Sequence, residues 1–131
     1  MRDLKKFQGV FPAFYACYDS AGSVDPEGVR ALTRHLIEKG VAGVYVGGSS
    51  GECIYQSVSE RKLVLENVMA EAKGKLTVIA HVACNNTADS QELAAHAESL
   101  GADAIAAIPP IYFHLPPYGI AQYWNCLLYT S

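Results

Sequence analysis

The feature that most constrains the fold is a regular alternation of short apolar segments with amphipathic helical segments. Each apolar segment is predicted to be a strand, and each is followed after a short loop by a helical pattern. Such βα units require parallel strands joined by right-handed crossovers. The predicted strands are Phe7 to Tyr15, Val41 to Val46, Leu76 to Val82 and Ala104 to Ile108.

Local capping signals mark the boundaries of four predicted helices. An N-cap residue or a capping box begins a helix, proline is favoured at its first position, and glycine commonly ends it. The predicted starts are Asp25 followed by Pro26, the box Ser57 to Glu60, Asn86 or Thr87, and Pro117 or Tyr118. The predicted ends of the first three helices are Gly40, Gly74 and Gly101.

Composition excludes several classes of protein. Half of the 131 residues are hydrophobic and 18% are charged, which is typical of a globular domain and not of a disordered chain. The net charge of −3 argues against nucleic acid as a partner. No apolar run approaches the roughly 18 residues of a membrane span, and the start is too broken for a signal peptide. We therefore expect a cytoplasmic protein that contacts no membrane.

The four cysteines are scattered and contain no C-x-x-C pair. In a cytoplasmic protein we expect them to be reduced and partly buried. A metal site built from Cys53, Cys84 and His81 is disfavoured by the spacing of these residues. We expect neither a metal nor a cofactor.

A loop rich in glycine and serine follows the second predicted strand. Residues 47–52 read Gly-Gly-Ser-Ser-Gly-Glu. Glycine leaves backbone N–H groups unshielded, and Ser49 and Ser50 add hydroxyl donors, so this loop is suited to bind a carboxylate or phosphate. The alternative is a turn whose serines cap the next segment. The residues of the loop alone leave both interpretations open.

The repeat pattern favours a barrel over a Rossmann sheet. The second and fourth strands are introduced alike, by Glu-Lys-Gly-Val-Ala-Gly and Ser-Leu-Gly-Ala-Asp-Ala, and no G-x-G-x-x-G follows the first strand. A (β/α)8 barrel usually takes about 250 residues. The chain is therefore either about half of such a barrel or a smaller α/β fold.

Four motifs resemble the N-acetylneuraminate lyase/dihydrodipicolinate synthase family, over about Phe7 to Asn125. They are Tyr-Val-Gly-Gly-Ser-Ser-Gly-Glu at residues 45–52, Gln-Ser-Val-Ser-Glu-Arg at 56–61, Ala-His-Val at 80–82 and Pro-Ile-Tyr at 110–112. The likeness is greatest to the N-acetylneuraminate lyase branch. It implies a TIM (β/α)8 barrel, here truncated to about the first four βα units, with residues 126–131 as a tail that does not resemble the family.

The resemblance also implies an activity and a set of partners. Family members are class I pyruvate aldolases, usually homotetramers, that form a Schiff base on a lysine and relay protons through a tyrosine. Both of those residues are expected beyond Ser131, so this chain alone is expected to be inactive. The implied reaction cleaves N-acetylneuraminate (sialic acid) to N-acetylmannosamine and pyruvate. The alternatives are dihydrodipicolinate synthase, another keto-acid aldolase, or a non-catalytic half-barrel interaction domain.

Particular residues receive roles from the same resemblance. Ser49 and Ser50, with the amides around them at Gly48 and Gly51, are expected to bind the pyruvate carboxylate. Tyr112 matches a tyrosine that reaches into a neighbouring subunit's site in the synthase branch; the alternative is a core aromatic at the barrel rim.

Other polar residues are assigned from the sequence directly. Glu52 is expected to tie loop amides together in preference to acting as an acid or base, and His81 to be a core histidine with satisfied nitrogens. His114 lies in a proline-rich loop, where contact with sugar hydroxyls is the less favoured interpretation. The six lysines are expected in the N-terminal tail, in or ending helices, and before the third strand, away from the catalytic end of the barrel.

Overall fold

A computed structural model describes residues 4–128, which form a parallel α/β structure. The strands and the helices that follow them alternate along the chain. In order, the elements are the 3-10 helix η1 (Lys5–Phe7), α1 (Pro26–Glu38), β1 (Gly43–Val46), the 3-10 helix η2 (Ser49–Gly51), α2 (Val58–Ala72), β2 (Thr77–His81), α3 (Thr87–Leu100), β3 (Ala104–Ala106) and α4 (Pro117–Leu128).

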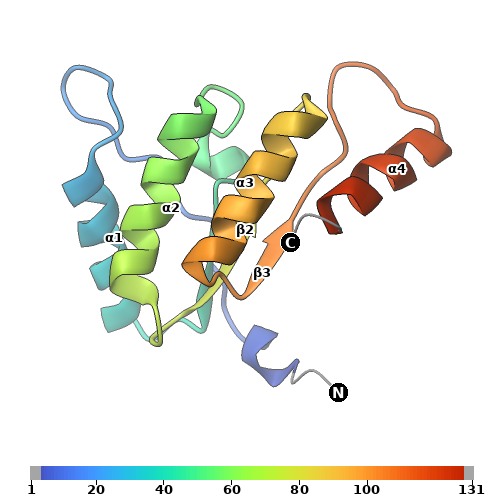
Figure 1. Cartoon of the computed structure of the whole chain (residues 1–131). Coiled ribbons are helices and arrows are strands. Elements are labelled where there is room, and N and C mark those ends of the chain that lie inside the picture. The colour runs from blue at the N-terminus through green and yellow to red at the C-terminus, as the bar shows by residue number, and fades with distance from the viewer. Residues whose placement is uncertain (1–3, 129–131) are drawn as a thin grey trace.

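The three strands form one parallel sheet in the order β1-β2-β3. Val44 pairs with Val78, and Ala80 pairs with Ile105. Helices α1, α2 and α3 lie side by side on one face of this sheet, and α4 lies beyond β3 (Figure 1). Within the described residues, no helix covers the opposite face (Figure 1). The predicted parallel α/β fold is confirmed.

The first predicted strand, Phe7 to Tyr15, is wrong as a regular strand. The segment runs parallel to β1 but forms a single isolated bridge, between Ala13 and Tyr45. Its hydrogen bonds to β1 include Tyr45 N to the Pro12 carbonyl oxygen, at 3.0 Å. Pro12 has no N–H to donate, and Gly9 has a φ of +116°, so the ladder is interrupted on both sides of the bridge. The segment still lies where the first strand of a barrel would lie.

The predicted helix starts are confirmed by their caps. The Asp25 side chain accepts a backbone N–H in the first turn of α1. Ser57 and Glu60 form a reciprocal capping box at α2, with distances of 3.2 Å and 2.7 Å. Asn86 caps α3, and Gly101 ends it with a φ of +80°. These local contacts satisfy backbone groups that a helix end leaves without partners.

The core lies between the sheet and the three covering helices. Alternate strand residues point into it, as a two-residue period requires. The buried side chains of this layer include Val44, Val46, Val78, Ala80, Val64, Leu65, Val68, Leu93, Ala94 and Ala97. Tyr45 and Ile79 alternate with the buried strand residues and are only half-buried, on the face without helices. The sheet is thus packed on one side only.

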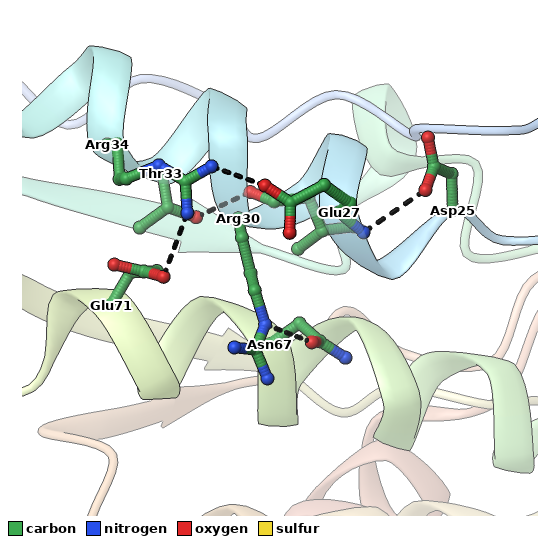
Figure 2. Close-up of polar contacts among 8 residues, drawn as sticks. Asp25, Glu27, Arg30, Thr33, Arg34, Asn67 and Glu71 are labelled. Atoms are coloured by element: carbon green, nitrogen blue, oxygen red, sulfur yellow. Dashed lines mark hydrogen bonds and ion pairs between the residues drawn. The ribbon is translucent and has the colours of Figure 1, made fainter.

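Polar contacts fix α1 against α2 (Figure 2). Arg30 Nε donates to Asn67 Oδ1 at 2.7 Å, and Asn67 is buried. Arg34 bridges Glu71 at 3.0 Å and Glu27 at 2.5 Å. Because the Arg34 pairs are exposed to solvent, they contribute little to stability, whereas the part-buried Arg30–Asn67 bond fixes the relative position of the two helices.

Helix α4 continues through Leu128. Leu127 is 2% exposed, and the Tyr123 hydroxyl lies 2.8 Å from Ser90 Oγ on α3. The predicted tail at residues 126–131 therefore begins inside α4, and residues 129–131 lie outside the described residues. The boundary after residue 125 stays a prediction. None of the helices within residues 4–128 is long and apolar enough to span a membrane.

Candidate functional site

The glycine–serine loop lies at the carboxyl end of β1. Gly47 turns the chain with a φ of +75°, and the 3-10 helix η2 follows. Inside the loop, Gly51 N donates to the Gly48 carbonyl oxygen at 3.0 Å. Ser49 and Ser50 are exposed, and within residues 4–128 neither their N–H groups nor their hydroxyls form a hydrogen bond. Both serines therefore present unused donors at the end of the sheet where ligands bind in parallel barrels.

Gly48 and Gly51 are buried where a side chain would collide. A Cβ on Gly48 would lie 2.7 Å from Tyr45 Cε1, and one on Gly51 would lie 3.0 Å from the Phe14 carbonyl oxygen. The Gly51 amide is used inside the loop, as described above. These glycines let the backbone pack closely below the serines, which is a different contribution from direct ligand contact.

Glu52 ends η2 in the left-handed conformation, with a φ of 57°. Its N–H donates to the Ser49 carbonyl oxygen at 3.0 Å. Tyr18 lies beside it and accepts a hydrogen bond from Gln56 Nε2 at 3.1 Å. That bond favours the phenolate, but burial and the Glu52 carboxylate outweigh it, so the pKa of Tyr18 is raised. The predicted role of Glu52 in tying the loop together agrees with these contacts.

His81, the last residue of β2, joins the ends of all three strands. Its Nδ1 lies 2.8 Å from the Gly47 carbonyl oxygen, and the Ile108 N–H donates to Nε2 at 3.5 Å. The side chain is 5% exposed. Burial lowers the pKa of His81 and the Arg61 guanidinium adds to that effect, although the Gly47 bond opposes it. The prediction of a core histidine with satisfied nitrogens is confirmed.

Arg61 is a structural residue of this site to which the sequence analysis assigned no role. It lies on α2 and is 6% exposed. Nη2 donates to the His81 carbonyl oxygen and Nη1 to the Ala83 carbonyl oxygen, both at 2.7 Å. Nη1 also lies 3.1 Å from Cys84 Sγ. Its position directly after the capping-box glutamate was the available signal, but the partners come from a distant segment.

A cavity of about 320 Å³ lies along the carboxyl ends of the strands. Arg61, His81 and Cys84 line it together with Cys53. Burial raises the pKa of Cys84, although Arg61 opposes this shift. No group of three or more metal-binding side chains occurs among residues 4–128, and all four cysteines are free thiols. The structure therefore brings these cysteines and His81 to one cavity without forming a metal cluster from the described residues.

Tyr112 and His114 lie in the loop before α4. Tyr112 is 91% exposed and has a φ of +84°, which is rare for a residue with a side chain. Its ring packs edge-on against Phe113, with centroids 4.9 Å apart. Both aromatics line a second cavity, of about 670 Å³, beside α4. His114 is exposed, and neither Ser49 nor Ser50 lines this cavity or the one beside Arg61.

The six lysines lie away from the carboxyl ends of the strands, as predicted. Lys75 precedes β2, which begins at Thr77, so it lies at the amino end of the sheet. Three lysines have polar partners elsewhere: Lys6 with Asp103, Lys62 with Glu92, and Lys73 with the Leu100 carbonyl oxygen. Lys5 lies in η1 and Lys39 is the C-cap of α1.

Solved structures and known sequences resemble this chain over nearly all its length. An N-acetylneuraminate lyase of Mediterraneibacter gnavus is 74% identical over 127 residues, which are 97% of this chain and 40% of that protein. The structure of a catalytic lysine mutant of Ruminococcus gnavus sialic acid aldolase superposes with a TM-score of 0.97 at 72% identity, over 99% of this chain and 43% of that one. A dihydrodipicolinate synthase structure gives a TM-score of 0.89 at 33% identity, over 95% and 43% of the two chains.

The chain thus spans about two-fifths of the length of the relatives it matches. Its parallel βα units are those of a TIM-barrel aldolase, as the sequence motifs implied. The model of the dihydrodipicolinate synthetase family matches residues 6–130. With that coverage, the chain belongs to the dihydrodipicolinate synthetase family.

Proposed function

We propose that the complete protein is a class I pyruvate aldolase that cleaves N-acetylneuraminate to N-acetylmannosamine and pyruvate. In this proposal the chain contributes the part of the barrel that binds the pyruvate carboxylate. The observation that carries the proposal is the pair of unused hydroxyls, Ser49 and Ser50, at the carboxyl end of β1. They occur in a chain 74% identical to a protein named as N-acetylneuraminate lyase.

Ser49 and Ser50 would bind the carboxylate through their hydroxyls and N–H groups. Hydrogen bonds to an ionised group are about twice as strong as those between neutral groups. A bound carboxylate fixes the keto carbon relative to an attacking amine, and such positioning lowers a barrier by several kcal/mol in favourable cases. Gly48 and Gly51 would act by allowing the loop its close packing, with the Gly48 N–H as a further donor.

The amine and the proton relay would come from residues outside this chain. A Schiff-base lysine must lose its proton near neutral pH, which requires a desolvated site next to the bound carbonyl. The six lysines of this chain lie at helices, at the N-terminal segment and at the amino end of β2. The Ruminococcus gnavus aldolase is described with a catalytic lysine of its own. We therefore expect the isolated chain to lack lyase activity.

The same proposal covers assembly and location. We expect a homotetramer in which Tyr112 reaches a neighbouring subunit. An aromatic side chain that is 91% exposed on a backbone of positive φ supports a contact outside this chain. Four free thiols support a reducing compartment, the cytoplasm. The substrates would be small molecules, pyruvate and sialic acid, with no cofactor.

Dihydrodipicolinate synthase is the alternative within the family. Its carboxylate loop would serve pyruvate in the same way, so the loop does not separate the two activities. The lower identity, 33% against 74%, favours the lyase. Residues that read the second substrate are expected beyond Ser131, so the remainder of the protein decides between these reactions.

A chimera tests the proposal directly. Residues 1–125 of this chain would replace the aligned region of the Mediterraneibacter gnavus lyase, which supplies the rest of the barrel. The chimera is expected to cleave N-acetylneuraminate, and borohydride with pyruvate is expected to label a single lysine of the lyase portion. The isolated chain is expected to remain unlabelled.

Two outcomes would reject the proposal. One is a folded chimera that forms no pyruvate adduct and cleaves no N-acetylneuraminate, while the parent lyase does both. The other is a stoichiometric reduced adduct on any of the six lysines of this chain, located by mass spectrometry.

A further inference from the structure

The ring of His81 contacts the segments that follow both neighbouring strands. On one side, Nδ1 lies 2.8 Å from the carbonyl oxygen of Gly47, which follows β1. On the other side, the N–H of Ile108, which follows β3, donates to Nε2 at 3.5 Å. The ring is 5% exposed, so water does not compete freely for either nitrogen.

These two partners determine the tautomer of the ring. A carbonyl oxygen only accepts hydrogen bonds, so Nδ1 must carry the proton. A backbone N–H only donates, so Nε2 must be the unprotonated acceptor. The imidazole is therefore neutral, with its proton on Nδ1 directed at Gly47. A rotated ring or the opposite tautomer would lose both contacts.

The Gly47 carbonyl group is a point at which the serine loop can be oriented. Gly47 has a φ of +75°, and a Cβ placed on it would lie 3.2 Å from the His81 carbonyl oxygen. The next carbonyl, of Gly48, accepts the N–H groups of Gly51 and Cys53 at 3.0 Å and 3.3 Å. The peptide plane held by His81 therefore directly precedes the carbonyl that closes the loop around Ser49 and Ser50.

Arg61 fixes the backbone that carries this ring. Its Nη2 donates to the His81 carbonyl oxygen, and its Nη1 to the Ala83 carbonyl oxygen. Arg61 lies one turn into α2, which begins at the capping box of Ser57 shortly after the serine loop. The loop, the start of α2 and the end of β2 are thus joined in one closed set of contacts.

We propose that His81 is a positioning residue that orients the carboxylate-binding loop through its Nδ1–H bond to the Gly47 carbonyl oxygen, without contacting the substrate. What the loop binds rests on the function proposed above. The effect of His81 on the order of the loop does not, and it can be measured separately.

Two variants separate the ring nitrogens. His81→Asn places an amide donor near the Nδ1 position and retains a bond to Gly47, whereas His81→Gln places its amide near Nε2 and loses that bond. Amide hydrogen exchange of Gly51, Glu52 and Cys53, whose N–H groups close the loop, reports its order. We expect His81→Gln to accelerate this exchange about tenfold and His81→Asn to change it less than about twofold.

The measurement uses the isolated chain and the chimera, with His35→Asn and His35→Gln as matched controls. His35 is exposed on α1, so neither substitution should alter exchange in the loop. Equal acceleration by both His81 variants, or none by either, would overturn the proposal. So would ¹⁵N NMR of the unsubstituted His81 ring showing the proton on Nε2.

Kinetics of the chimera provide the functional readout. In the condensation direction, His81→Gln should raise KM for pyruvate about tenfold with a smaller change in kcat, while His81→Asn should keep KM near that of the unsubstituted chimera. Equal KM values for the two variants, with equal losses of Tm, would indicate a packing role alone and reject the proposal. A folded chimera without any pyruvate adduct would reject the proposed function, and hydrogen exchange would still decide the role of His81.

Discussion

Nη2 of Arg61 lies 2.7 Å from the carbonyl oxygen of His81, and both side chains are more than nine-tenths buried. A buried cation is costly unless its N–H groups find acceptors. Here the acceptors of Nη1 and Nη2 are two backbone carbonyls at the end of β2, together with the Cys84 sulfur, and no carboxylate pairs with Arg61 within residues 4–128. The guanidinium thereby attaches α2 to the edge of the sheet that carries the serine loop.

Replacing Arg61 should destabilise the protein. Arg61→Lys keeps the charge but cannot reach both carbonyl groups in the same geometry, so one buried acceptor loses its partner. We expect a loss of about 1–3 kcal/mol in the free energy of unfolding. Urea denaturation of the chimera measures it, with Arg34→Lys at an exposed ion pair as the control. Equal urea midpoints for the two variants would contradict this account.

The Ser50 hydroxyl should matter for pyruvate and not for folding. Ser50→Ala in the chimera removes one donor to the carboxylate, and we expect kcat/KM to fall by an amount equivalent to about 1.5–3 kcal/mol, with KM for pyruvate raised. Ser20→Ala, at an exposed turn, is the matched control. Steady-state kinetics decide the assignment, and unchanged constants for Ser50→Ala would remove Ser50 from the proposed site.

His81 should make stability depend on pH. Because burial and Arg61 lower its folded pKa below the ordinary value of 6.5, the unfolded chain binds a proton more readily than the folded one. The stabilisation is complete above about pH 6.5 and is lost as the pH falls from there through the folded pKa. Urea midpoints across this range should decline for the unsubstituted chimera. The decline should be smaller for His81→Asn, and identical slopes would contradict the assignment.

The isolated chain should self-associate. The edge of β3 and the segment at Val10 to Phe14 both border the sheet, and one sheet face has no covering helix in the described residues (Figure 1). Unpaired strand edges and exposed apolar faces favour intermolecular pairing. Analytical ultracentrifugation should find concentration-dependent aggregates of the chain, while the chimera remains a discrete oligomer. A soluble monomer with a sharp, cooperative melt would identify a self-sufficient α/β domain instead.

The sequence by itself determined the elements whose signals are local. The starts of α1, α2 and α3 were predicted because Asp25, Ser57 and Asn86 cap backbone groups only two or three residues away. The order of the parallel units followed from alternating periodicities, and the family followed from short motifs. The loop at Ser49 and Ser50 was likewise visible, because glycines and hydroxyls carry their conformational and chemical properties with them.

Only the tertiary structure decided which distant groups meet. Gln8 to Tyr15 became an extended segment with a single bridge to β1, because Gly9 and Pro12 interrupt pairing that a hydrophobic pattern alone suggests. The partners of His81 lie 34 and 27 residues away along the chain, and those of Arg61 lie on another strand end. A hydrogen bond between such segments exists only after parallel packing has brought the strand ends together, so no local pattern encodes it.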